Sequence, residues 1–170
     1  MINYNELDKK ARLGAFSTLD MEVLVPEVMK LMDNEIYLEV GVDKGKSLSV
    51  ARMVAKPNVL VCGVDLREDP KVPNTVFYQG DSADIARTWD KWKISLLFID
   101  GDHSYQGCKR DIEAWYPLMK EGGVLLFHDC DETSPGVVQA VFEFFNTHKC
   151  KTIELFKRTD KNTSMAKICL

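Results

Sequence analysis

The sequence has no cysteine pattern typical of disulfides or structural zinc. Its five cysteines are an odd number, stand far apart and form no CxxC pair; they are Cys62, Cys108, Cys130, Cys150 and Cys169. A disulfide framework or a zinc site would require closer or paired spacing. We therefore expect reduced thiols in a cytoplasmic protein.

Long apolar runs and an excess of positive charge are also missing. No apolar run approaches the roughly 18 residues that a membrane span needs, and the first ten residues are polar, unlike a signal peptide. The formal net charge is -4 and the pI is about 5.4. Such a balance gives no electrostatic footprint for nucleic acid or anionic lipid. We expect neither a nucleic-acid partner nor a membrane partner.

What the sequence does contain is a regular alternation of strand-like and helix-like segments. Its 170 residues suit one domain, 1–170, in which 1–35 form an N-terminal helical segment. Short apolar runs predict strands, and segments with helical spacing between them predict helices. The strands are 36–41, 59–65, 76–79, 94–99 and 124–127, followed by a hairpin of 152–156 and 164–168 around the polar turn 158–163. The helices are 17–32, 47–54, 83–88, 105–115 and 135–145. This order predicts an α/β fold with a mostly parallel sheet, helices on both faces and a C-terminal antiparallel hairpin.

Polar residues or glycines occur at the carboxyl ends of all five predicted parallel strands. In sheets of this kind, ligands bind beyond those ends. The residues are Glu39 and Gly41, Asp65, Gly80 and Asp81, Asp100, and His128 with Asp129.

The first strand ends in a glycine turn that favours a nucleoside ligand. Gly41 and Gly45 have GxxxG spacing, which is neither the dinucleotide fingerprint GxGxxG nor a phosphate-binding loop. The next helix begins near Ser47, with its free amides toward the ligand. An acid at Glu39 would repel a pyrophosphate and attract a cation. This pattern favours S-adenosylmethionine (SAM) over NAD.

Two further strand ends match the rest of a nucleoside. Asp65, 20 residues after Gly45, suits a bidentate contact with ribose hydroxyls. At the next strand end, Asp81 and Ser82 could offer a carboxylate to the exocyclic amine of adenine and an amide to a ring nitrogen. Each residue alone could be only a turn or a helix cap. Their occurrence at successive strand ends favours a shared ligand.

These motifs resemble those of class I SAM-dependent methyltransferases. The resemblance rests on EVGVDKGKS (39–47), Asp65 and GDS (80–82), and it covers about residues 36 to 145. FIDGDHSY (98–105) and PLMKEGGVLLFHD (117–129) narrow it to the methyltransferase-24 type group, related to metal-dependent catechol and caffeoyl-CoA O-methyltransferases. The resemblance implies a Rossmann-like, seven-stranded sheet with a terminal antiparallel hairpin. It also implies that SAM is surrounded by Glu39, Gly41, Ser47, Asp65, Asp81 and Ser82.

The last two parallel strands predict a metal site and a proton acceptor. Asp100 matches the first metal-binding aspartate of the metal-dependent relatives, while His128 and Asp129 fall at their second carboxylate and its neighbour. The imidazole of His128 shifts the preference from magnesium toward manganese, iron or zinc. His103 is the candidate general base, because its ordinary pKa of about 6.5 suits proton transfer near neutrality. Alternatively, His103 caps the following helix or orders its loop.

The function that we expect is O-methylation of a small hydroxylated acceptor, assisted by a divalent metal such as magnesium or manganese. One alternative is a SAM-binding module without methyl transfer, because no large insertion supplies a lid over the substrate. Another is a nicotinamide-dependent oxidoreductase, which the GxxxG spacing disfavours. We also expect that a homodimer could close the open cleft.

Overall fold

The computed structural model describes residues 2–157 and 164–170, which form seven strands and six α-helices. The strands are β1 (Ile36–Val40), β2 (Leu60–Asp65), β3 (Val76–Gln79), β4 (Ile94–Ile99), β5 (Met119–Phe127), β6 (Thr152–Lys157) and β7 (Ser164–Cys169). The helices are α1 (Tyr4–Lys10), α2 (Thr18–Lys30), α3 (Lys46–Val54), α4 (Ser82–Arg87), α5 (Tyr105–Trp115) and α6 (Pro135–Thr147), with a 3-10 turn at Tyr116–Leu118.

One mixed sheet connects all seven strands in the order β3-β2-β1-β4-β5-β7-β6. The five strands from β3 to β5 are parallel, whereas β7 runs antiparallel to both β5 and β6. The predicted fold class, with its terminal antiparallel hairpin, is therefore confirmed. The predicted hairpin turn at 158–163 lies outside the described residues.

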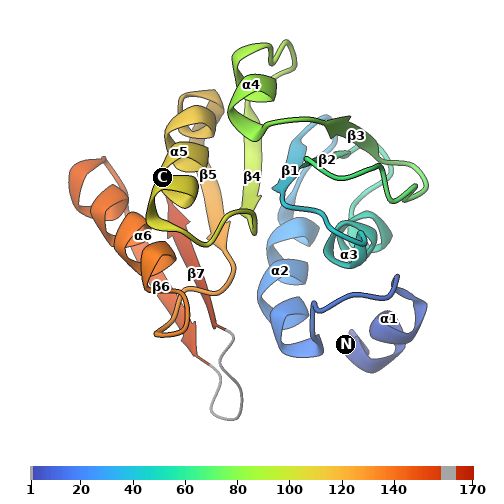
Figure 1. Cartoon of the computed structure of the whole chain (residues 1–170). Coiled ribbons are helices and arrows are strands. Elements are labelled where there is room, and N and C mark those ends of the chain that lie inside the picture. The colour runs from blue at the N-terminus through green and yellow to red at the C-terminus, as the bar shows by residue number, and fades with distance from the viewer. Residues whose placement is uncertain (1, 158–163) are drawn as a thin grey trace.

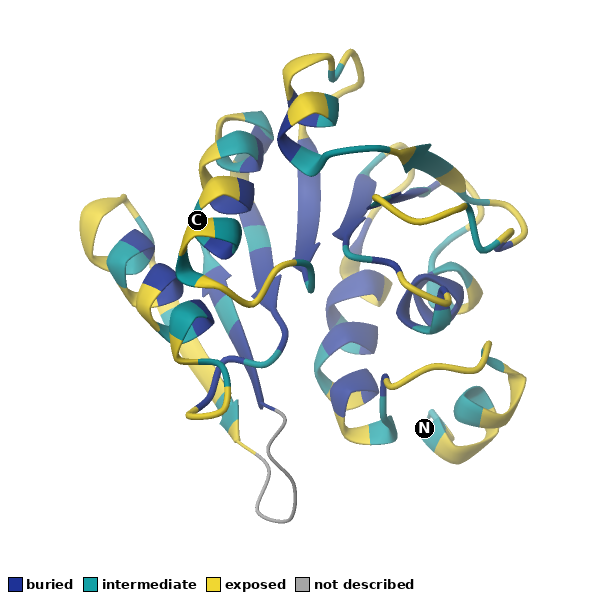
Figure 2. Cartoon of the chain, in the orientation of Figure 1, coloured by how far each residue is buried: buried dark blue, intermediate teal, exposed yellow. Residues whose placement is uncertain are grey.

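Helices pack on both faces of the sheet (Figure 1), and alternating side chains of the central strands supply a core on each face. On β1, Leu38 and Val40 pack toward α5 and α6, and Tyr37 packs toward α2 and α3. The central strands are buried almost throughout, as their apolar runs predicted (Figure 2). Helices therefore cover both faces of the central strands, and a ligand can reach the carboxyl ends of these strands.

Strand β5 differs from the prediction because it begins at Met119 rather than at residue 124. Ile94 pairs with Met119 and Leu96 pairs with Val124, so two steps along β4 correspond to five along β5. The extra residues form an irregularity at Gly122, whose φ is +74°. Gly122 and Gly123, which lie before the predicted strand 124–127, are instead part of a bulge within a longer strand.

The helices in the described part of the chain are too short or too polar to cross a membrane. The longest, α2 and α6, have 13 residues each, against the roughly 20 that a spanning helix requires. The cytoplasmic location inferred from the cysteines stays a prediction.

Replacing Leu97 with alanine should test the burial of the central sheet. Leu97 lies on β4 and is fully buried, so Leu97→Ala should lower the free energy of unfolding by about 3 kcal/mol. Leu155 lies on the edge strand β6 with 44% of its surface exposed, so Leu155→Ala should change it by less than about 0.5 kcal/mol. Urea unfolding measures both values. Equal losses would contradict this packing.

Candidate functional site

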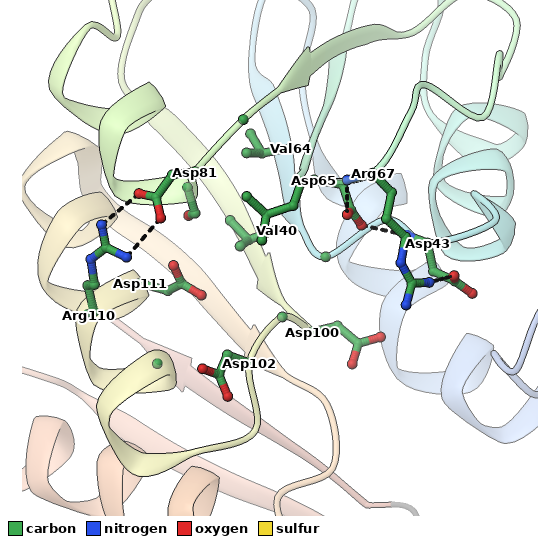
Figure 3. Close-up of a pocket in the computed structure, with 16 residues that line it drawn as sticks. Val40, Asp43, Val64, Asp65, Arg67, Asp81, Asp100, Asp102, Arg110 and Asp111 are labelled. Atoms are coloured by element: carbon green, nitrogen blue, oxygen red, sulfur yellow. Dashed lines mark hydrogen bonds and ion pairs between the residues drawn. The ribbon is translucent and has the colours of Figure 1, made fainter.

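A cleft of about 500 Å³ lies beyond the carboxyl ends of β1, β2, β3 and β4 (Figure 3). Five residues predicted to bind cofactor or metal line it together: Gly41, Asp65, Asp81, Ser82 and Asp100. The remaining lining residues are Val40, Asp43, Val64, Leu66, Arg67, Gly80, Gly101, Asp102, Gly107, Arg110 and Asp111. The strand ends identified in the sequence thus meet at one cleft.

The glycine turn after β1 lies directly against the end of β4. Gly41 has a φ of +87°, and a Cβ on it would come within 2.1 Å of the carbonyl oxygen of Asp100. Its N–H donates to the carbonyl of Val64 at 2.9 Å. Only glycine allows this conformation and this approach. The turn is thereby fixed to β2 and β4 at once.

The carboxylate of Asp65 holds the same turn from the end of β2. One oxygen accepts hydrogen bonds from the amides of Val42 at 2.7 Å and Asp43 at 2.8 Å, and the other accepts from Arg67 N at 2.8 Å. A carboxylate has about four acceptor positions, so one remains for a ribose hydroxyl. Asp65 therefore organises the loop, and this geometry leaves room for one hydrogen bond of its predicted bidentate contact with ribose.

Glu39, Gly45 and Ser47 do not line the cleft, although they were predicted to bind the cofactor. Glu39 is fully buried and accepts hydrogen bonds from Ser47 Oγ at 2.5 Å and from the hydroxyl of Tyr37 at 2.6 Å. Gly45 is the N-cap of α3. These residues support the loop from behind. Because Glu39 is fully buried, it does not contact a ligand in the cleft, and its expected attraction of a cationic ligand does not fit this position.

Burial raises the pKa of Glu39 to about 8. Hydrogen bonds from Ser47 and Tyr37 oppose this shift, and the negative charges of Asp100 and Asp65 add to it. At neutral pH the side chain is therefore largely protonated and neutral, so it ties β1 to α3 as a hydrogen-bonded acid.

Two hydrogen-bonded side chains form the cleft wall at the end of β3. Asp81 accepts from Arg110 through both oxygens, at 2.8 and 2.7 Å, and caps α4 by accepting from Asp84 N at 3.1 Å. Ser82 Oγ accepts from the indole N–H of Trp115 at 2.8 Å. Both residues lie where the sequence placed them, but their side chains already have protein partners.

Arg110 and Asp111 line the cleft and were missed in the sequence. The signal that could have found them is the helical spacing of α5, where Gly107, Arg110 and Asp111 recur three and four residues apart. This spacing places all three on the face of the helix that borders the cleft.

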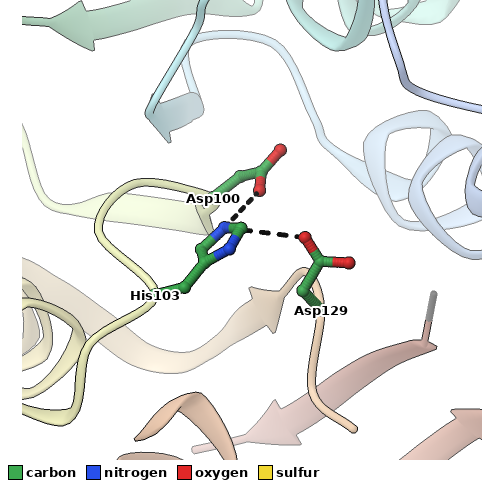
Figure 4. A group of neighbouring side chains, drawn as sticks. All are labelled: Asp100, His103 and Asp129. Atoms are coloured by element: carbon green, nitrogen blue, oxygen red, sulfur yellow. Dashed lines mark ion pairs between the residues drawn. The ribbon is translucent and has the colours of Figure 1, made fainter. Parts of the chain in front are cut away.

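The second part of the site is a group of two carboxylates and an imidazole: Asp100, His103 and Asp129 (Figure 4). One potential ligand atom from each lies within 4.8 Å of the others. The His103 Nε2 atom is 3.4 Å from Asp100 Oδ1 and 3.6 Å from Asp129 Oδ2. Asp129 adopts a φ of +52°, a left-handed conformation that aspartate tolerates better than most residues. Because Asp100 also lines the cleft, the two parts of the site adjoin.

Of the predicted metal ligands Asp100, His128 and Asp129, the two carboxylates group with His103, and His128 lies behind them. Its ring is 93% buried behind the two carboxylates, with Nδ1 3.2 Å from Asp129 and 3.4 Å from Asp100, and Nε2 3.5 Å from Asp20. Burial alone would lower the pKa of His128, but these three acids raise it to about 12. His128 is thereby held by three carboxylates behind the site, and His103 is the imidazole that joins Asp100 and Asp129 in the group described above.

His103 also carries an altered affinity for protons. Its contact with Asp100 raises the pKa of the ring, against the effect of partial burial, and Asp129 adds to the increase. The pKa of Asp100 is lowered despite burial, because His103 and His128 favour its charged form. Both carboxylates therefore favour the protonated form of His103, which lies in reach of the cleft.

Glu39→Gln should remove a pH dependence of stability. The folded-state pKa of about 8 exceeds the ordinary 4.5, so between these values the folded protein retains a proton that the unfolded chain releases. Wild-type stability should fall as pH rises through this window, by about 2 kcal/mol more than that of Glu39→Gln between pH 5.5 and 7.5. Urea unfolding at both pH values measures the difference. An equal change in the free energy of unfolding of wild type and Glu39→Gln between the two pH values would contradict it. The control Glu121→Gln, on an exposed side chain, should behave as the wild type does.

Comparison with known sequences places this site among methyltransferases. A family model described as a methyltransferase domain, the methyltransferase-24 family, matches residues 38–130. An uncharacterised protein of Acanthamoeba polyphaga mimivirus is 29% identical, over 64% of this chain and 58% of its own length. An uncharacterised protein of Sinorhizobium fredii is 40% identical over 25% of this chain and 5% of its own. The chain thus spans less than two thirds of either relative.

Solved structures share the fold at low sequence identity. A precorrin-6y C5,15-methyltransferase from Geobacter metallireducens has a TM-score of 0.71 at 14% identity, covering 95% of this chain and 94% of its own. A candidate methyltransferase from Streptococcus mutans, in complex with S-adenosylhomocysteine (SAH), has a TM-score of 0.69 at 13% identity. The match covers 88% of this chain and 96% of that protein. A TDP-rhamnose 3'-O-methyltransferase of calicheamicin biosynthesis has a TM-score of 0.63 at 17% identity. The match covers 89% of this chain and 77% of that protein. With the family match over more than half of the chain, this protein belongs to the methyltransferase-24 family, whose model is described as a methyltransferase domain.

Proposed function

We propose that this methyltransferase transfers the methyl group of SAM to a hydroxyl oxygen of a small molecule. The observation that carries the proposal is the double position of Asp100, which lines the cleft and also belongs to the Asp100–His103–Asp129 group. A methyl donor in the cleft would therefore lie next to groups that can bind and deprotonate a hydroxyl. Such proximity is the main requirement of a methyl transfer between two bound molecules.

The charge of the cleft supports SAM as its ligand. Six aspartates and two arginines line it, so the surroundings favour a cationic sulfonium and disfavour the pyrophosphate of NAD. We place the methionine part near Gly41 and Asp100, the ribose near Asp65 and the adenine toward α4 and α5. The negative charge of the cleft lining, rather than the buried Glu39, is therefore what favours a cationic ligand. The same charge disfavours the nicotinamide-dependent alternative.

The Asp100–His103–Asp129 group has a donor set that fits a divalent metal. Two carboxylates with one imidazole suit manganese, iron or zinc better than magnesium. A metal held there would act as a Lewis acid on the acceptor hydroxyl. Without a metal, the neutral form of His103, half exposed beside Asp100, is placed to take up the hydroxyl proton, while the carboxylates orient the acceptor oxygen toward the methyl donor.

Oxygen is favoured over other acceptor atoms because of this acidic edge. The structural relatives act on varied substrates by their names: a sugar nucleotide, a precorrin and, for one from Clostridium thermocellum, rRNA. The net negative charge of the chain and of the cleft lining argues against RNA and for a small acceptor. A SAM-binding module that transfers no methyl group would bind SAM and never release SAH with any pool of hydroxylated compounds.

Calorimetric titration should detect SAM binding with micromolar affinity. Asp65→Ala removes the acceptor that holds the glycine turn, so it should weaken binding by about 10- to 100-fold. Asp69→Ala, on the same loop but outside the cleft lining, is the matched control and should leave the affinity unchanged. Absence of SAM binding to folded wild-type protein would reject the proposed ligand.

Manganese titration, followed by electron spin resonance, should test the proposed metal site. Asp129→Asn and His103→Gln should each weaken Mn²⁺ binding at least tenfold, because each removes a ligand of the proposed site. Asp102→Asn lines the cleft outside that group and should change binding little. A wild-type protein that takes up no manganese, or equal losses in all three variants, would refute the metal site.

A further inference from the structure

One face of α5 forms a wall of the cleft. Gly107, Arg110 and Asp111 line it together (Figure 3). Gly107 lacks a side chain where a Cβ would lie 2.3 Å from the carboxylate of Asp102. The helix therefore packs closely against the loop after β4, and Arg110 and Asp111 enter the end of the cleft opposite Asp43 and Arg67.

The two acids at this end differ in how their oxygens are used. Asp81 Oδ1 accepts from Arg110 and from Asp84 N, and Oδ2 accepts from the other nitrogen of the guanidinium. Its charge is thereby neutralised by a bidentate ion pair. One acceptor position remains on Oδ2, but a new amine there would lie beside the guanidinium and compete with a charge-assisted pair of good geometry.

Asp111 has acceptor capacity left. Only 8% of its surface is exposed, yet it lines the cleft, where one carboxylate oxygen lies beside Gly101. Among the described residues, no N–H group donates to its carboxylate, which faces the side chain of Ser82. A buried acceptor without an N–H partner costs free energy until a ligand donates to it.

A second property agrees with this incomplete set of partners. Burial raises the pKa of Asp111 to about 6, with Ser82 opposing the shift and the charge of Asp81 adding to it. A donor from a bound ligand would stabilise the charged form.

We propose that Asp111 accepts a hydrogen bond from the exocyclic amine of adenine, and that Asp81 serves to hold Arg110 in the wall. This inference rests on the proposed SAM site. It differs from the sequence-based prediction, which assigned the amine to Asp81. Gly101 leaves space for the Asp111 carboxylate and the adenine amine, because a Cβ at Gly101 would lie 3.1 Å from Asp111 Oδ2.

The experiment compares SAH with S-inosylhomocysteine, in which a carbonyl replaces the exocyclic amine. Calorimetry on the wild type should show SAH binding about 10- to 100-fold more tightly, as expected for a buried donor to a carboxylate. Asp111→Asn should reduce that ratio to about threefold or less, since an amide can donate to the carbonyl. Asp81→Asn should retain most of the ratio, and Glu113→Gln, on an exposed side chain of the same helix, should retain all of it.

Each outcome separates the two proposals. No binding of either ligand to the wild type would reject the SAM site itself. Binding of both with equal affinity, or loss of discrimination in Asp81→Asn but not in Asp111→Asn, would overturn the role of Asp111 alone. Asp111→Ser, which is smaller and neutral, replaces Asp111→Asn if thermal unfolding shows that the amide variant is not folded.

Discussion

The close contact between Gly41 and the carbonyl oxygen of Asp100 is the constraint on which the site depends. It brings the turn after β1 against the end of β4 at a distance that no side chain would allow. Asp65 fixes the same turn from β2 through two amides. Three neighbouring parallel strands thereby set the position of one loop, and the cleft has its shape before any ligand enters.

The second organising feature is the balance of charge along this edge of the sheet. Asp20, Asp100 and Asp129 would repel one another if the buried ring of His128 did not lie between them. Arg110 has the same relation to Asp81 on the other side of the cleft. The acidic edge is therefore compensated from behind, and its remaining negative charge faces the cleft. That orientation suits a cationic methyl donor.

The sequence predicted the strands well where an apolar run was short and bounded by glycine, proline or aspartate, as in β3 and β4. It missed the full length of β5, because Gly122 and Gly123 are as typical of a turn as of a bulge. Strand ends also identified the cleft, since carboxyl ends of parallel strands must share one edge. Hydrophobic pattern alone was enough for these inferences.

The choice between the histidines could not be predicted in this way. His128 follows the alternation of β5 toward the α2 face, where its ring contacts Phe16 and Phe98. Asp129 departs from that alternation through a positive φ, which leaves no mark in the pattern of apolar residues. Asp111 was missed for another reason, because the prediction of the site rested on strand ends and Asp111 lies on a helix.

A crystal structure of the protein with bound SAH tests the central claim most directly. The account predicts SAH in the cleft, with its ribose hydroxyls within hydrogen-bonding distance of Asp65 and its amino-acid part beside Gly41 and Asp100. SAH bound on another surface, or ribose hydroxyls turned away from the end of β2, would contradict it.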